Sequence, residues 1–88
     1  MNTIKLNKKE FDSYQLEEIY LGLKDDLDVS IYAKPEYDDY QMKQIRLGLL
    51  SDIDVYIYAK PQLSYLKMNE EYNKLLNQEI DKYILDND

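Results

Sequence analysis

At 88 residues without a single cysteine, the chain is long enough for one modest core and has neither disulfides nor a thiolate zinc site to support it. Its 18 acidic and 11 basic residues give a net charge of -7, which argues against direct binding of nucleic acid and favours either a basic partner surface or simple solubility. No apolar run approaches the roughly 18 residues of a membrane span, and the polar start lacks a signal peptide's apolar middle, so we expect a cytoplasmic protein without membrane contact.

Residues 11–36 and 37–62 are two copies of one unit, in which about 15 of 26 aligned positions are identical. The segment IYAKP near the end of each copy is repeated without change. We therefore predict a single domain over residues 1–88, in which a degenerate third repeat over residues 63–88 follows the two full copies. The predicted fold is all-α: a compact tandem helical repeat of long helix, turn and short helix, closed by a long C-terminal helix.

Each copy opens with the signals of a helix start. Asp12 is placed as the N-cap, and Gln15 stands three residues later, where its side chain returns the capping bond. An apolar stripe at helical spacing follows and predicts an amphipathic helix of about three turns. The stripe of the first copy consists of Leu16, Ile19, Tyr20 and Leu23. The second copy repeats the cap and the stripe with Asp38, Gln41, Met42, Ile45, Arg46 and Leu49.

The segment that follows this helix has two interpretations. Val29–Ala33 is rich in β-branched and aromatic residues, which is typical of a short strand. Asp28 before it is a suitable helix cap, and the residue before Pro35 must leave the helical region, so we prefer a short helix. Asp54 and Val55–Ala59 repeat this pattern in the second copy, and a strand remains the alternative in both.

The third copy begins like the others and then changes. Ser64 stands at the cap position, but the copy lacks the glycine found at Gly22 and Gly48, which marks either a tight helix contact or the last helical turn. A helical stripe instead runs on towards residue 85 and predicts one long closing helix. We expect Ile4 and Leu6 to cover the other end of the array.

The second copy carries the motif Q-M-x-x-I-R-x-G-L over Gln41–Leu49, followed by D-V-x-x-Y-A-K-P over Asp54–Pro61. This pattern resembles a short tandem repeat of uncharacterised proteins from low-GC Gram-positive bacteria, their phages and conjugative elements. In the first copy Tyr20 replaces the usual arginine, and both copies lack the glycine that is frequent in the turn of that family. The resemblance implies a mobile-element setting in a bacterial host and brings no activity with it.

Residues that carry chemistry are scarce. Without histidine or cysteine, and with no lysine at a telling distance from any serine, the chain is expected to be no enzyme and to need no cofactor. Asp26 with Asp28 and Asp52 with Asp54 form two D-x-D pairs, but neither pair precedes the glycine and glutamate of a calcium-binding EF-hand loop. Helix capping explains Asp28 and Asp54 better, so we predict no metal site, although cation binding by these turns stays open.

Function is expected to lie on a surface that binds protein. Tyr14 and Leu21, like Tyr40 and Leu47, project away from the apolar stripe, and burial between units explains them more simply than a partner does. Positions at which the two copies differ are better candidates for partner contacts, and the acidic turns supply charge. The predicted partner-binding residues are Tyr20, Asp25, Asp26, Asp28, Arg46, Asp52, Asp54 and Tyr56.

Size, charge and resemblance together suggest a phage or mobile-element inhibitor, similar to anti-CRISPR and anti-restriction proteins. Such an inhibitor would occlude the basic groove of a host nucleic-acid-binding enzyme. The alternative is a structural repeat protein that self-associates into a homo-oligomer. The sequence identifies neither the partner nor the oligomeric state.

Overall fold

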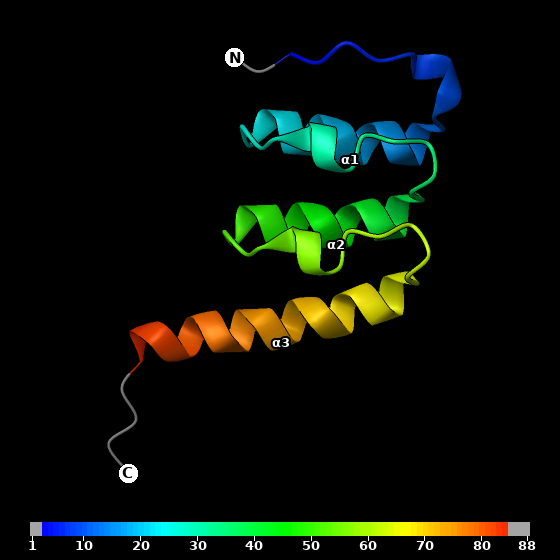
Figure 1. The fold of residues 1–88 in the computed structure, drawn as a ribbon. Helices are drawn as coiled ribbons and strands as arrows, with labels where there is room; N and C mark the ends of the chain where they lie inside the picture. The colour runs from blue at the N-terminus through cyan, green and yellow to red at the C-terminus, as the bar shows by residue number, and fades with distance from the viewer. Residues whose placement is uncertain (1–2, 85–88) are drawn as a thin grey trace.

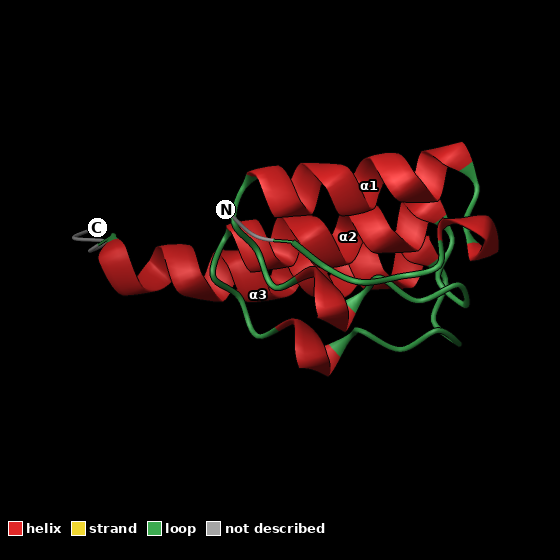
Figure 2. Ribbon diagram, turned by 90° about the horizontal axis from the view of Figure 1, so that it is seen from above, coloured by secondary structure: helices red, strands yellow, loops and turns green. Residues whose placement is uncertain are grey.

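Within residues 3–84, three α-helices lie side by side in one layer and run in the same direction (Figure 1). The α-helices are Ser13–Lys24 (α1), Asp39–Leu50 (α2) and Tyr65–Tyr83 (α3). Three short 3-10 helices accompany them: Lys8–Glu10 (η1), Val29–Ile31 (η2) and Val55–Ile57 (η3). Figure 2 shows η2 and η3 on one face of the layer. The computed structural model describes residues 3–84, so the last four residues of the predicted third repeat lie outside the described part.

Side-chain caps fix the starts of the α-helices, as predicted. Asp12 accepts a hydrogen bond from the Gln15 amide at 2.8 Å, and Gln15 Oε1 accepts one from the Asp12 amide at 2.8 Å. Asp38 and Gln41 form the same capping box before α2, and the hydroxyl of Ser64 caps α3. Each cap satisfies a backbone donor that the first helical turn leaves unpaired, which stabilises a helix by about 1 kcal/mol.

Gln15 also joins its own unit to the next one. Its Nε2 donates to the carbonyl oxygens of Pro35 at 3.4 Å and Tyr37 at 2.7 Å, both of which belong to the chain that enters α2. Gln41 makes the equivalent two bonds to the chain that enters α3. These bonds hold the starts of successive α-helices at the same edge of the layer, which makes the helices parallel.

α1 and α2 both end in a Schellman motif. After α1, the amide of Leu27 donates to the Gly22 carbonyl at 2.9 Å, and the amide of Asp26 donates to the Leu23 carbonyl at 3.1 Å. Asp26 has a φ of 62°, and Asp52 has a φ of 57° at the same place after α2. A side chain disfavours this left-handed conformation, which glycine adopts without strain.

The segments after these turns are helical, so the preference for a short helix over a strand is confirmed. Each is a 3-10 helix of only 3 residues, shorter than predicted. Asp28 caps η2 by accepting the amide hydrogen of Ser30 at 3.2 Å, and Asp54 caps η3 in the same way. Pro35 limits how far any helix here could extend, because the residue before a proline avoids the helical conformation, but η2 already ends at Ile31.

The two glycines mark a close contact, one of the two roles predicted for them. A Cβ atom at Gly22 would overlap the Tyr32 hydroxyl and lie 2.5 Å from Val29 Cγ1. Gly48 meets Tyr58 and Val55 in the same way. Glycine is therefore required here so that η2 and η3 can pack directly against the α-helix that precedes each of them.

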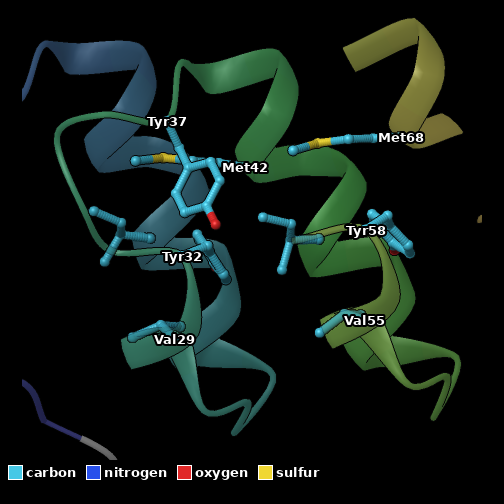
Figure 3. Packing of buried hydrophobic residues seen from close by; sticks show 9 residues of the cluster. Val29, Tyr32, Tyr37, Met42, Val55, Tyr58 and Met68 are labelled. Atoms are coloured by element: carbon cyan, nitrogen blue, oxygen red, sulfur yellow. The ribbon is translucent and has the colours of Figure 1, made fainter. Parts of the chain in front are cut away.

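The core is a row of equivalent side chains between the α-helical layer and the short helices. Figure 3 shows the labelled core residues Val29, Tyr32, Tyr37, Met42, Val55, Tyr58 and Met68. The hydroxyls of Tyr32 and Tyr58 donate to the backbone carbonyls of Glu18 and Gln44, each at 2.6 Å. Burial raises the pKa of both tyrosines well above the usual value of 10.0.

Packing on the outer side of α1 agrees with the prediction, whereas the exposure of two tyrosines does not. Ile4 and Leu6 pack against the core cluster along the side of α1 that has no neighbouring α-helix. The expected burial of Tyr14 and Tyr40 between units is wrong, since both side chains are mostly exposed. They belong to the first turn of their helices, at the edge of the layer. The ring of Tyr40 stacks there on Tyr65, with ring centroids 5.0 Å apart.

Candidate protein-binding surface

The two acidic turns lie along one edge of the layer, because α1 and α2 run in the same direction and both end there (Figure 1). The aspartate side chains of both turns are exposed. We call this row the acidic edge, which consists of Asp25, Asp26, Asp28, Asp52 and Asp54. The structure thus brings together the five predicted charged contacts from two distant parts of the sequence.

The acidic edge is electrostatically unfavourable for the helices that carry it. The C-terminal end of an α-helix bears a partial negative charge, and an added carboxylate there costs about 0.3–1 kcal/mol. Asp25 is the C-cap of α1, and the last turn of α2 contains no basic residue. Asp28 and Asp54 serve the fold as caps of η2 and η3, whereas Asp25, Asp26 and Asp52 oppose its local preference. Residues of the second kind are typical of functional surfaces.

Of the two predicted tyrosine contacts, only one lies beside the acidic edge. Tyr56 belongs to η3, its amide donates to Asp54, and 69% of its surface is exposed. Tyr20 is 59% exposed but lines a hollow with Ile4 and Leu6, on the outer side of α1. The equivalent position in α2 is Arg46, which faces α1, whereas Tyr20 faces the segment of Ile4 and Leu6.

Arg46 lies between helices and does not point to solvent. Its Nε is 2.6 Å from Glu18 Oε2, and only 12% of the arginine side chain and 15% of the glutamate side chain are exposed. At the next interface Gln44 takes the place of Glu18 and accepts a hydrogen bond from Asn69 at 2.9 Å. The two copies therefore differ at these positions because each interface has its own polar pair, and we leave Arg46 out of the proposed contact surface.

Each acidic turn borders a hollow in the surface. The hollow beside the first turn has a volume of about 450 Å³ and is lined by residues that include Ile4 and Asp26. The hollow beside the second turn has a volume of about 270 Å³ and lies between that turn and α3. Its lining includes Asp52, Leu75 and Glu79. The second hollow therefore combines carboxylates with apolar side chains.

Sequence reasoning missed an apolar surface at the end of α3. This helix has 19 residues, whereas α2 has 12, and it extends past the ends of its neighbours (Figure 2). The predicted stripe of the closing helix includes Ile80, Tyr83 and Ile84, which are exposed by 41%, 82% and 63%. The sequence already indicated this surface. The copies are offset by 26 residues, so Leu76 is the equivalent of Leu50 at the end of α2, and the apolar stripe continues past Leu76.

Within residues 3–84, no three Asp or Glu side chains are grouped so that they could hold a metal ion. None of the helices in this range is both long and apolar enough to cross a bilayer. Comparison of the chain with protein-family models, curated proteins and solved structures finds no match.

Proposed function

We propose that the chain is a non-enzymatic protein-binding module, whose acidic edge contacts a basic surface on another protein. One observation carries this proposal: five exposed aspartates are aligned where two parallel helices end, although negative charge is unfavourable at the positions of Asp25, Asp26 and Asp52. A row of carboxylates reinforced by the negative ends of helices produces a field similar in sign to that of a phosphate backbone. Tyr56 adds an aromatic side chain beside this row.

The most concrete form of the proposal is a phage or mobile-element inhibitor that acts in the bacterial cytoplasm. The acidic edge would occupy the basic groove of a host nucleic-acid-binding defence enzyme and exclude its substrate, as in an anti-CRISPR protein. The net charge of -7 supports attraction to such a groove over distances of about one Debye length, roughly 8 Å at physiological salt.

We further propose that α3 closes a tandem helical repeat over residues 1–88. The side of α3 that faces away from α2 carries Lys67, Glu70 and Lys74, and ion pairs link Lys67 and Lys74 to the acidic residues on this helix. Lys74 stands at the position of Gly48, where a further short helix would require a glycine. A polar outer face is typical of a terminal repeat, and it supports a different protein as partner over end-to-end self-association.

Two variants with the same net charge test the location of the binding surface. The edge variant replaces the five aspartates of the acidic edge by asparagine, which retains the helix caps, tolerates left-handed φ and changes the net charge from -7 to -2. The control variant removes five exposed or half-exposed carboxylates elsewhere. Its substitutions are Glu10→Gln, Glu17→Gln, Glu36→Gln, Asp39→Asn and Glu70→Gln.

The experiment is an affinity pull-down from a nuclease-treated bacterial lysate, followed by mass spectrometry and a DNA-binding assay with each recovered enzyme. We expect the wild type and the control variant to capture a basic nucleic-acid-binding enzyme and to displace DNA from it. The edge variant should do neither. The proposal is wrong if the wild type recovers no such enzyme, or if both variants lose the partner equally.

A further inference from the structure

The two interfaces between neighbouring α-helices share their main contacts. Met42 in the first interface and Met68 in the second are both fully buried, at equivalent positions of α2 and α3 (Figure 3). Gln15 and Gln41 make the same hydrogen bonds to the unit that follows each of them. These shared contacts therefore do not decide which α-helix packs on which.

The interfaces differ in their polar side chains. In the first, Glu18 of α1 pairs with Arg46 of α2 at 2.6 Å, and both side chains are mostly buried. In the second, Gln44 of α2 stands at the position of Glu18 and accepts a hydrogen bond from Asn69 of α3 at 2.9 Å. Tyr72 of α3 stands at the position of Arg46. The first interface is thus matched by opposite charges, and the second is matched by neutral groups.

We propose that these polar pairs fix the order in which the units pack, so that separate copies of the chain do not assemble with one another while they fold. If α3 of one copy packed on α1 of another, Tyr72 would face Glu18 and leave a mostly buried carboxylate without a cation. If α2 packed on α2 of another copy, Arg46 would face Gln44 and have no carboxylate. A buried charge without its partner is strongly unfavourable, whereas the native order pairs both charges.

The pairs need to distinguish only α2 from α3. The outer side of α1, which carries Tyr20, is already covered by Ile4 and Leu6. A single buried polar group can fix the register of helices, as coiled coils show. Such a role concerns the assembly of the chain itself, so it does not depend on the proposed function.

Protein concentration determines when a wrong order can compete. Misassembly between copies is a characteristic failure of repeat proteins. The neighbouring unit of the same chain acts at an effective concentration in the millimolar range. Without the polar pairs, packing between copies is therefore expected only when the protein concentration approaches about 1 mM.

Two variants make the interfaces alike and so remove the proposed distinction. Glu18→Gln, Lys43→Asn and Arg46→Tyr together give the first interface the residues of the second, because Lys43 stands at the position of Asn69. This variant changes the net charge from -7 to -8, so weaker repulsion between copies would not explain any association. The other variant, with Gln44→Glu, Asn69→Lys and Tyr72→Arg, gives the second interface the residues of the first.

Each full-length protein is unfolded in urea and refolded by dialysis at protein concentrations from about 10 μM to about 1 mM. Size-exclusion chromatography with light scattering then measures the mass. We expect the wild type to refold as a monomer throughout. Each variant should be monomeric at the lowest concentration, whereas about a third or more of it should form dimers or larger species at the highest.

Circular dichroism checks that each variant folds, and the mass of a folded variant decides the result. Monomers of both variants at the highest concentration would show that the order is fixed without the polar pairs, which overturns the inference. Equal association of the wild type would overturn it as well. If neither variant folds at the lowest concentration, the pairs serve stability alone, and the proposed role in ordering the units is wrong.

Discussion

Aspartates lie at both ends of α1 and α2, but their surroundings differ. At the start of each helix, Asp12 and Asp38 accept backbone hydrogen bonds where the helix dipole favours negative charge. After the end of each helix, Asp26 and Asp52 adopt left-handed φ where the dipole opposes negative charge. Aspartate therefore stabilises the fold at the edge where the two helices start and destabilises it at the edge where they end. The difference separates an edge that maintains the structure from an edge available for binding.

The largest effect is expected at the edge that maintains the structure. Gln41→Ala removes the bond to the amide of Asp38 and two bonds to the chain that enters α3, which leaves the carbonyls of Pro61 and Leu63 unpaired. We expect a loss of about 3 kcal/mol in the free energy of unfolding, measured by urea denaturation. Gln62→Ala, at an exposed position, is the control and should change stability by less than about 0.5 kcal/mol. A similar effect of both substitutions would contradict the structural role of this edge.

Between the two edges lie the buried tyrosines, which make stability sensitive to alkaline pH. Burial raises the pKa of Tyr32 and Tyr58 in the folded protein above the value of 10.0 expected in the unfolded chain. The folded protein therefore binds more protons at high pH, so stability is fully present below pH 10 and falls as pH rises towards the folded pKa. We expect a loss of about 2.7 kcal/mol per pH unit above pH 10 from the two groups together.

Urea denaturation at a series of pH values measures this loss. Burial also raises the pKa of Tyr37, so three buried tyrosines contribute to the slope. Tyr58→Phe removes one of them and should make the slope shallower by about 1.4 kcal/mol per pH unit. An unchanged slope in this variant would show that the alkaline loss arises elsewhere. Asp25 of the acidic edge also raises the pKa of Tyr32, so the edge variant should lose slightly less stability at high pH than the wild type does.

Removal of charge from the acidic edge should stabilise the protein. The edge variant removes the carboxylates of Asp25, Asp26 and Asp52 from the negative ends of two helices, while Asp28→Asn and Asp54→Asn keep the caps of η2 and η3. We therefore expect a gain of about 1–2 kcal/mol in unfolding free energy at low salt. This gain should shrink as sodium chloride is added, because salt screens exposed charges. The control variant, with the same net charge, should gain less than half as much. Equal gains would mean that total charge matters and its location does not.

The smallest expected effect concerns the backbone of the acidic turns. Asp52→Gly relieves the left-handed conformation and should raise the unfolding free energy by about 0.5–1 kcal/mol. Asp52→Ala keeps the strained conformation and should give no comparable gain. Thermal unfolding of the two variants side by side tests this, and a gain from alanine as large as that from glycine would refute the conformational explanation.

Much of the fold could be predicted because its signals are local. Helix starts are indicated within a few residues of sequence, by Asp12 with Gln15 before α1 and by Ser64 before α3. The Schellman turns were missed because aspartate occupies the place where glycine is expected. The hydrogen bonds from Gln15 to the chain that enters α2 were missed for another reason. Their acceptors are the backbone carbonyls of Pro35 and Tyr37, which are distant in sequence, and every residue type has such a carbonyl.

The candidate surface was only partly predictable, for a different reason. Differences between copies pointed to Arg46, but that difference arises from pairing with Glu18 across an interface that no single unit contains. The alignment of the acidic turns depends on the parallel direction of the helices, which the sequence leaves undetermined. Exposure of Tyr83 depends on how far α3 extends past α2, which appears only when the two helices are placed side by side.

The most direct test of the central claim is a map of where a basic partner touches the molecule. Nuclear magnetic resonance of the isotope-labelled protein, titrated with a synthetic lysine-rich peptide, reports contacts at each backbone amide. We predict shifts at Asp26, Asp52 and Tyr56, with little change at the helix starts around Asp12. Shifts concentrated at the helix starts, or spread evenly over all exposed acidic residues, would contradict the assignment of the acidic edge as the binding surface.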